Sequence, residues 1–403
     1  MKDKYKIAVI GLGYVGLPLA KSFSKYFNTI GYDVDHNLID NLKSKESKSL
    51  NFSKNPSDLI DSNIYIIAVP TPVNKDNIPD LRSLESATTL ISNYINQNDI
   101  VIYESTVYPG VTEEFCIPII ENITNLKLNI DFFCGYSPER ISPGDNTKSV
   151  EDIVKVTSGS NKETADKIDN IYKKIIKAGT FKASSIKVAE ASKVIENVQR
   201  DVNIALMNEF AMIFDKLNLS TKDVLEAAKT KWNFLDFKPG LVGGHCVGVD
   251  PYYLIHKSKK SGFIPNLMNT SRETNNYIPE FISNKLNTIF EKNKKNISKT
   301  DVLILGFTFK ENCEDIRNSK VLDIETKLTD YGCNVDIYDP LLENNNKIIK
   351  DPFKSNKKYD GIILAVSHND FYKYTEDDFN KISKENLVLL DIKGVYSFAT
   401  WKF

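Results

Sequence analysis

The sequence has 403 residues, of which 41% are hydrophobic and 26% charged, and its net charge of -1 is ordinary for a globular protein of two or three domains. This charge excludes bulk attraction to nucleic acid or anionic membranes, and no apolar run suits a signal peptide or a membrane span. Five scattered cysteines without CxxC spacing favour reduced thiols in the cytoplasm, and four histidines without ligand spacing argue against a metal site.

The chain begins with the pattern of a dinucleotide site. A buried strand over residues 6–10 runs into a GxGxxG motif, Gly11-Leu12-Gly13-Tyr14-Val15-Gly16, and then into a helical apolar pattern. In such a motif Gly11 permits the tight turn, Gly13 lets the backbone approach a pyrophosphate, and Gly16 allows a helix to pack closely on the strand. The alternative is a parallel α/β turn with chance glycines.

An acid follows at the end of the second predicted strand, residues 29–33. Asp33 lies 22 residues after Gly11, the separation expected of an acid that binds a ribose 2′-hydroxyl. Its charge would repel a 2′-phosphate, so the pattern favours NAD over NADP.

Three polar loops are predicted at the carboxyl edge of this sheet. The strand over 64–69 runs into Pro70 and Thr71, and the strand over 100–103 runs into Glu104-Ser105-Thr106. A third loop holds Glu139, a candidate general base, beside Arg140, with which it could instead form an ion pair in a turn. Ser160 to Glu163 has the pattern of a capping box that opens a helix.

A long helix is predicted from about residue 188 to 217, without Gly or Pro. Glu190, Lys193 and Asn197 share one face of it, and Lys193 and Asn197 could both donate to one developing oxyanion. The alternative is a solvated polar stripe. Ser220 caps the next helix, and residues 266–290 are expected to form a helical pair broken near Pro279.

Between these helices lies a glycine-rich loop with a cysteine. Gly243 and Gly244 allow unusual backbone angles and close approach of a ligand, so Cys246 could be presented at a cleft as a nucleophile. Asp250, four residues on, could orient a water or a base. The alternative, a buried structural cysteine in a tight turn, fits the loop equally well.

The last third repeats the strand pattern of the first. Strands are predicted over 301–306, 334–340, 361–366 and 387–391, without a GxGxxG motif, so this part is not expected to hold the dinucleotide. Lys310 and Arg317 lie in the loop after its first strand and could bind a diphosphate or carboxylate. Their alternative is salt bridging to neighbouring acids: Glu311, Glu314 or Asp315.

The predicted class is therefore α/β, with two Rossmann-like doubly wound domains joined by a long-helix domain. The expected boundaries are 1–185 for the NAD-binding domain, 186–295 for the helical domain with the cysteine, and 296–403 for the second Rossmann-like domain.

Taken together, the motifs resemble the UDP-glucose/GDP-mannose dehydrogenase family, over about residues 5–396. The resemblance rests on the glycine motif with Asp33, Val69-Pro70-Thr71-Pro72, Glu104 to Gly110, Ser137-Pro138-Glu139-Arg140, Lys193 with Asn197, Cys246 to Asp250, and Phe309-Lys310 with Asp315-Ile316-Arg317. Lys231 to Leu235 and Pro239 to Cys246 look most like bacterial UDP-N-acetylhexosamine 6-dehydrogenases of surface-polysaccharide pathways, acting on UDP-GlcNAc or UDP-GalNAc.

The resemblance implies a four-electron oxidation of a sugar C6 alcohol to a carboxylate with two NAD per turnover. Asn197 and Asp250 would hold a water that acts as base, Lys193 would stabilise the alkoxide, and Cys246 would form a thiohemiacetal and then a thioester. Glu139 is the expected base for hydrolysis.

The same resemblance assigns binding roles. It places Thr106 at the nicotinamide side and near an active-site water. The other implied contacts with NAD are Gly11, Gly13, Tyr14, Val15, Gly16, Asp33, Pro70 and Thr71. The implied contacts with the UDP-sugar are Glu139, Arg140, Lys193, Asn197, Gly243, Tyr252, Lys310 and Arg317, the last possibly from a partner subunit. A homodimer or larger homo-oligomer is expected.

One position departs from the family pattern. The basic residue that often follows the ribose acid is replaced by Leu38, which puts one adenosine-side contact in doubt. Two other functions stay open: the same reaction on UDP-glucose or UDP-N-acetylmannosamine, and a catalytically silent NAD-binding scaffold.

Overall fold

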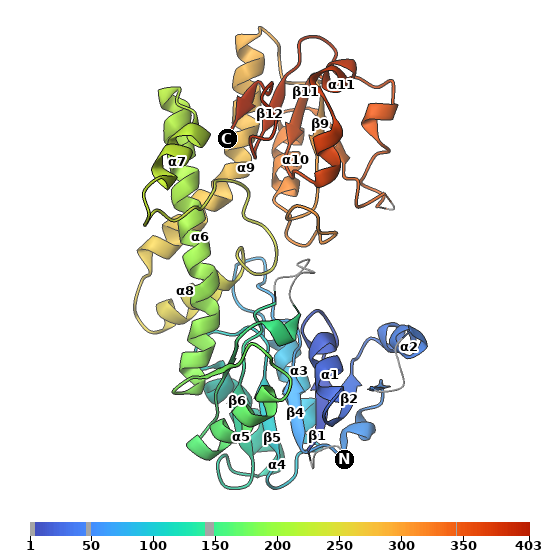
Figure 1. Ribbon diagram of the computed structural model, residues 1–403, viewed down its shortest axis with the longest axis vertical. Coiled ribbons are helices and arrows are strands. Elements are labelled where there is room, and N and C mark those ends of the chain that lie inside the picture. The colour runs from blue at the N-terminus through green and yellow to red at the C-terminus, as the bar shows by residue number, and fades with distance from the viewer. Residues whose placement is uncertain (1–4, 46–49, 142–148, 344) are drawn as a thin grey trace. The chain divides into compact units, whose positions relative to one another are not determined.

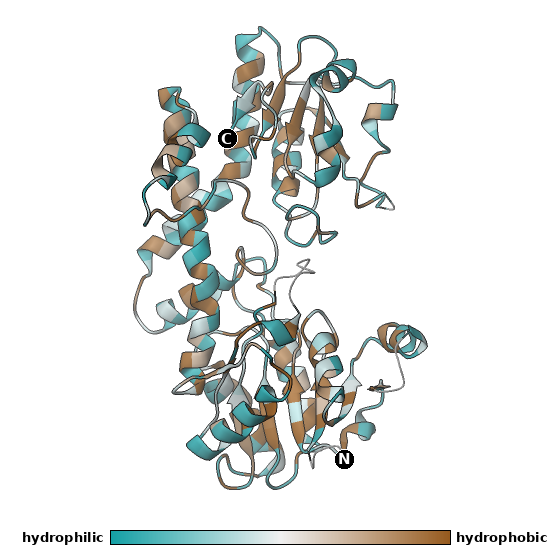
Figure 2. Ribbon diagram, in the orientation of Figure 1, coloured by the Kyte–Doolittle hydropathy of each residue, from teal (hydrophilic) through white to brown (hydrophobic). Residues whose placement is uncertain are grey.

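The structure, a computed structural model, describes residues 5–45, 50–141, 149–343 and 345–403. The chain forms two compact units, each made of two stretches of sequence: Met1–Glu196 with Tyr252–Ile264, and Asn197–Pro251 with Pro265–Phe403. Each unit holds a parallel sheet, and the strands of both sheets are strongly apolar (Figure 2). The predicted class, two Rossmann-like sheets with long central helices, is confirmed. The three domain boundaries stay predictions.

The first unit contains a six-stranded parallel sheet in the order β3-β2-β1-β4-β5-β6 (Figure 1). Its strands are β1 (Lys6–Ile10), β2 (Asn28–Tyr32), β3 (Asn51–Ser53), β4 (Ile64–Ile67), β5 (Ile100–Tyr103) and β6 (Phe133–Tyr136). Both faces of β1 are buried, since Ile7 and Val9 join one apolar cluster while Ala8 and Ile10 join the other. This strand order is that of dinucleotide-binding folds, which bind ligands at the carboxyl ends of the strands.

Helices and a small second sheet complete the first unit. The helices are α1 (Gly16–Ser24), α2 (His36–Lys45), α3 (Arg82–Ser92), α4 (Ile117–Thr124) and α5 (Lys162–Lys173), and β7 (Lys155–Thr157) pairs in parallel with β8 (Thr180–Lys182). The capping box predicted on Ser160 is wrong. Asn161 is the N-cap of α5 and accepts the Thr164 N–H at 2.8 Å, because the Ser160 hydroxyl is engaged by Asn129.

The second unit contains a five-stranded parallel sheet in the order β10-β9-β11-β12-β13 (Figure 1). Its strands are β9 (Asp301–Leu305), β10 (Asn334–Tyr338), β11 (Gly361–Leu364), β12 (Leu389–Asp391) and β13 (Trp401–Lys402), with helices α10 (Val321–Asp330) and α11 (Glu376–Lys381). Val302 and Ile304 face one apolar cluster and Leu303 and Leu305 the other, so β9 is also buried on both faces.

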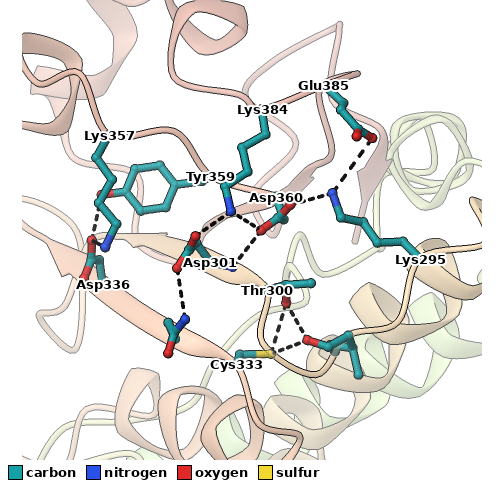
Figure 3. Close-up of polar contacts among 12 residues, drawn as sticks. Lys295, Thr300, Asp301, Cys333, Asp336, Lys357, Tyr359, Asp360, Lys384 and Glu385 are labelled. Carbon is teal, nitrogen blue, oxygen red and sulfur yellow. Dashed lines mark hydrogen bonds and ion pairs between the residues drawn. The ribbon is translucent and has the colours of Figure 1, made fainter.

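The amino edge of this second sheet carries a network of ion pairs (Figure 3). Asp360, just before β11, accepts from Lys384 at 2.8 Å and from Lys295 at 2.5 Å, and Lys384 also reaches Asp301 at the start of β9. Charges at this edge are thus neutralised by one another. In sheets of this kind ligands bind at the opposite, carboxyl edge.

Four helices lie between the two sheets in sequence: α6 (Ile186–Leu217), α7 (Thr221–Lys229), α8 (Asp250–Lys260) and α9 (Asn266–Lys292). The predicted long helix and the Ser220 cap are confirmed. The helical pair broken at Pro279 is wrong, because α9 is one helix that contains this proline. Ile278, Ile282 and Leu286 are fully buried in the core of the second unit, and this packing outweighs the lost backbone hydrogen bond.

Candidate functional site

The turn between β1 and α1 has the geometry that a dinucleotide requires. Gly11 has φ +89°, and a Cβ there would lie 2.8 Å from the Ala68 carbonyl oxygen. A Cβ on Gly16 would lie 1.8 Å from the Gly11 oxygen, whereas a Cβ on Gly13 would meet nothing within 4 Å. Two glycines are therefore demanded by packing, and Gly13 leaves open the approach to the helix N-terminus, as a bound pyrophosphate needs.

Asp33 holds this turn from the end of β2. Its Oδ2 accepts the Leu12 N–H at 2.7 Å and its Oδ1 accepts the Asp35 N–H at 2.9 Å, while the side chain stays half-exposed. A carboxylate fixed in this way and open to solvent is suited to a ribose. Tyr14 is 60% exposed and Val15 half-buried beside it. Leu38, the departure from the family pattern, packs partly buried against the apolar cluster under α1.

The loops after β4 and β5 are joined to each other. The Thr71 hydroxyl donates to the Thr106 carbonyl at 2.6 Å, and the Ser105 hydroxyl donates to the Val69 carbonyl at 2.7 Å. The Tyr253 hydroxyl donates to the Thr71 carbonyl. Thr106 is half-buried here and Pro70 exposed, so both predicted cofactor contacts lie on one connected surface at the carboxyl edge.

Glu190, on the first turns of α6, fixes the end of the Thr106 loop. Its buried carboxylate accepts the Gly110 N–H at 2.5 Å and the Thr112 N–H at 2.9 Å. Burial raises the pKa of Glu190 to about 7, although these hydrogen bonds act in the opposite direction. Sequence reasoning placed Glu190 on the polar face of the helix; the structure gives it a positioning role.

Glu139 lies in the loop after β6 and is 7% exposed. Its Oε1 accepts the N–H groups of Arg140 and Ile141, each at 2.6 Å. The Arg140 guanidinium does not pair with Glu139, because it binds Glu196 at 2.7 Å and the Val154 carbonyl at 2.9 Å. Within the described part of the chain, the cation that faces Glu139 is Lys155, 3.4 Å from Oε2, a residue that the sequence analysis did not single out.

In the second unit the cysteine loop and α6 meet. The Asn197 amide donates to Asp250 Oδ2 at 2.5 Å, and the Asp250 N–H donates to the Cys246 carbonyl at 2.8 Å. Asn197 and Asp250 are 5% and 3% exposed, whereas Cys246 is partly exposed. Asp250 is thus fixed one turn from a thiol that a substrate can reach, which favours the nucleophile over the buried structural cysteine.

The same loop lies against the segment after β9. Gly244 donates its N–H to the Asn318 carbonyl at 3.2 Å, and the Asn318 amide donates to the Gly244 carbonyl at 2.9 Å. A Cβ on Gly243 would lie 2.6 Å from the Asn318 oxygen, which explains that glycine. His245, next to Cys246, lies 3.5 Å from Arg317.

The two predicted cations of this segment differ. Arg317 forms a two-pronged pair with Asp315, with Nη2 to Oδ2 at 2.5 Å and Nε to Oδ1 at 2.9 Å, and is half-exposed. This is the salt-bridge alternative that the sequence left open. Arg317 holds the pKa of Asp315 below its usual value despite partial burial. Lys310 is partly buried over the Phe309 ring, 5.5 Å from its centre.

The remaining predicted residues are found as follows. Lys193 is 8% exposed on α6, one turn before Asn197, and Tyr252 is partly buried on α8. By unit, Thr106, Glu139, Lys193 and Tyr252 belong to the first, and Asn197, Cys246, Asp250, Lys310 and Arg317 to the second. Among the described residues, no group of three His, Cys, Asp or Glu side chains could hold a metal ion, and no helix is long and apolar enough to cross a membrane.

Several positioning residues escaped the sequence analysis because their partners are distant in the chain. Asn208 on α6 exchanges two hydrogen bonds with the Gly240 backbone, 3.1 and 2.7 Å, and so anchors the start of the cysteine loop. Asn208 also donates to Asn275, which donates to Asp201 at 2.7 Å. The one signal in the sequence was an asparagine, Asn208, in the middle of a predicted helix, away from any turn or helix cap.

Comparison with known proteins agrees with these motifs. Sequence profiles of the UDP-glucose/GDP-mannose dehydrogenase family match residues 43–176 (NAD binding domain), 187–277 (central domain) and 303–398 (UDP binding domain). The chain is 47% identical to a UDP-N-acetyl-D-glucosamine 6-dehydrogenase of Salmonella typhi and to one of Pseudomonas aeruginosa, covering 98% of this chain and 97% of each relative. The solved structure of the UDP-D-ManNAc dehydrogenase of Pyrococcus horikoshii superposes with a TM-score of 0.91 at 28% identity, covering 98% of both chains.

Proposed function

The chain belongs to the UDP-glucose/GDP-mannose dehydrogenase family and is an NAD-dependent UDP-sugar dehydrogenase, and we propose that its substrate is UDP-N-acetylglucosamine. The product is then the uronic acid, formed by oxidation of C6 through four electrons. The observation that carries the four-electron route is the fixed Asn197–Asp250 pair beside a partly exposed Cys246.

The first oxidation needs a proton acceptor and a charge stabiliser. The glycine turn and Asp33 would hold NAD, which would supply the acceptor for the hydride that leaves C6. Asp250, held by Asn197, orients a water that takes the proton of the C6 hydroxyl, and Lys193 stabilises the charge that develops on the oxygen. The sugar is now an aldehyde.

Cys246 makes the second oxidation possible. Its thiol adds to the aldehyde carbon to form a thiohemiacetal, which would lose a hydride to a second NAD and a proton to water to become a thioester. Water, deprotonated by Glu139, attacks the thioester carbon, so that the carboxylate and the thiol are released with one further proton. Covalent capture keeps the aldehyde in the site between the two oxidations.

The choice of substrate rests on similarity. The relatives at 47% identity are named for UDP-N-acetyl-D-glucosamine, and the solved structure named for UDP-D-ManNAc is only 28% identical. UDP-GalNAc, UDP-ManNAc and UDP-glucose are the competitors.

The experiment is an NADH progress curve with a limiting amount of UDP-GlcNAc, UDP-GalNAc, UDP-ManNAc or UDP-glucose. We expect two NADH per UDP-GlcNAc and a lower rate with the others. One NADH per sugar would retire the thioester route, and two NADH on another sugar alone would reassign the substrate. Absence of NADH with all four would favour the silent scaffold.

We also propose that the protein is a cytoplasmic homodimer or larger homo-oligomer. Large apolar side chains of the second unit are exposed, among them Trp232 at 91% and Leu235 at 60%, as is typical of association surfaces. Light scattering coupled to size exclusion tests this, and a monomeric mass at micromolar concentration would refute it.

A further inference from the structure

A buried lysine joins two carboxylates beneath the loop that carries Glu139. Lys155 Nζ, at the start of β7, lies 2.5 Å from Glu104 Oε2 and 3.4 Å from Glu139 Oε2. The side chains of Lys155, Glu104 and Glu139 are 3%, 0% and 8% exposed. The Tyr172 hydroxyl of α5 donates to the other oxygen of Glu104. All four groups belong to the first unit.

The charges of this cluster constrain one another. Burial opposes the charge of Lys155, but the two carboxylates outweigh it and raise the pKa of the ammonium, which stays protonated. Burial raises the pKa of Glu104, and Lys155 acts against this. Among the residues that the structure describes, a single cation thus serves the two carboxylates, and the shorter distance is to Glu104.

The contacts of Glu139 show why this matters. Its Oε1 is occupied by two backbone N–H groups at 2.6 Å, so Oε2, the oxygen that faces Lys155, is the one left to take a proton. Arg140, the neighbouring cation, is bound to Glu196. Burial disfavours the charged form of a carboxylate, and a nearby cation offsets this cost.

We propose that Lys155 is a positioning residue that orients Glu139 for thioester hydrolysis and stabilises its negative charge through their ion pair, with Glu104 competing for the same cation. This inference rests on the role of Glu139 in the proposed function. Lys155 itself does not touch the reacting atoms. If the Lys155–Glu104 pair were purely structural, it would connect β7 to the loop after β5 and have no effect on hydrolysis.

The test is the pH dependence of hydrolysis of the covalent enzyme, followed by rapid quench and intact-protein mass. In Lys155→Met the acidic limb should move up by about one pH unit, so that hydrolysis at a pH on that limb falls about 10-fold, and the first NADH burst should be unchanged. In Glu104→Gln the limb should move down, because Glu139 no longer shares the cation. Lys155→Arg should restore most of the rate.

The opposite directions of these two shifts are the decisive result. Shifts in the same direction, or no shift in Lys155→Met, would overturn the proposal. If Lys155→Met does not fold, the double variant Lys155→Met/Glu104→Gln removes the cation and one carboxylate together, and its limb should also move up; an unchanged limb there overturns the proposal too.

A further variant separates this inference from the proposed function. Glu139→Gln should stop hydrolysis and accumulate the covalent enzyme. If Glu139→Gln hydrolyses normally, the assignment of the base is wrong; if it stalls while the Lys155 variants keep the wild-type profile, only the role of Lys155 is wrong.

Discussion

The two sheets of this protein begin with the same turn, used differently. Gly11 donates to the Tyr32 carbonyl at 2.9 Å, and Gly306 donates to the Tyr338 carbonyl at 2.8 Å. The next residue donates to an acid in both: Leu12 to Asp33 at 2.7 Å and Phe307 to Asp339 at 2.6 Å. Both glycines have positive φ, +89° and +86°.

The acids then diverge. Asp33 is half-exposed, whereas Asp339 is fully buried and lies 2.9 Å from Nε2 of the buried His368, whose Nδ1 accepts the Asn312 N–H at 2.9 Å. Burial opposes ionisation of Asp339, but His368 and the backbone donors lower its pKa. In the first turn Asp33 remains accessible to a ligand. In the second turn Asp339 instead stabilises the loop that carries Lys310. A similar turn is therefore weak evidence of a second dinucleotide site.

The largest loss of stability is expected from a substitution of Gly16, which packs against the backbone, rather than of Gly13, which faces a ligand. Gly16→Ala would place a Cβ 1.8 Å from the Gly11 oxygen, so we expect a loss of about 4 kcal/mol of stability, measured by urea unfolding of the first unit. Gly13→Ala is the matched control, since it meets nothing within 4 Å; it should unfold like wild type and bind NAD more weakly. Equal stability of the two variants would contradict this account of the turn.

The two acids should respond in opposite ways to the same change. Asp339→Asn removes a buried, charge-assisted acceptor and should cost about 3 kcal/mol while leaving the KM for NAD unchanged. Asp33→Asn should change stability by less than about 1 kcal/mol and raise the KM for NAD about 10-fold. If Asp339→Asn raised the KM for NAD instead, the second turn would have a cofactor role.

A third acid, the buried Glu190, extends the comparison to pH. The pKa of Glu190 is raised to about 7, above that of an unfolded chain, so the folded state holds its proton over a range where the unfolded state has lost it. The contribution of Glu190 to stability should therefore fall by up to about 3 kcal/mol as pH rises from about 4.5 to 7. Glu190→Gln should lack this decline, which parallel unfolding series measure; identical slopes would show that burial does not govern this group.

The smallest effect concerns the departure at Leu38. An arginine there can cover the same apolar surface with its stem and extend its charge toward an adenosine phosphate or ribose. Leu38→Arg should lower the KM for NAD about 3-fold, by less than about 1 kcal/mol, without changing kcat. An unchanged KM would mean that the missing contact is supplied elsewhere.

The sequence predicts what depends on local pattern. The glycine turn after β1, the buried strands and α6 follow from residue spacing and apolar periodicity. The motifs also predict that Asn197, Cys246 and Asp250 act together, and Asn197 does bind Asp250. Pairings across long separations do not show in such patterns: Lys155 and Glu104 are 51 residues apart. The unbroken α9 could not be predicted either, because core packing around Ile278 and Ile282 overrides Pro279.

The most direct test of the account is whether Cys246 carries the sugar. We would mix Glu139→Gln enzyme with UDP-GlcNAc and NAD, quench, and measure the intact mass and the modified peptide. We expect a thioester-linked sugar nucleotide on Cys246 with two NADH formed per enzyme in the burst, and no adduct in the Glu139→Gln/Cys246→Ser control. Release of the uronic acid by Cys246→Ser at the wild-type rate, without any adduct, would contradict the mechanism.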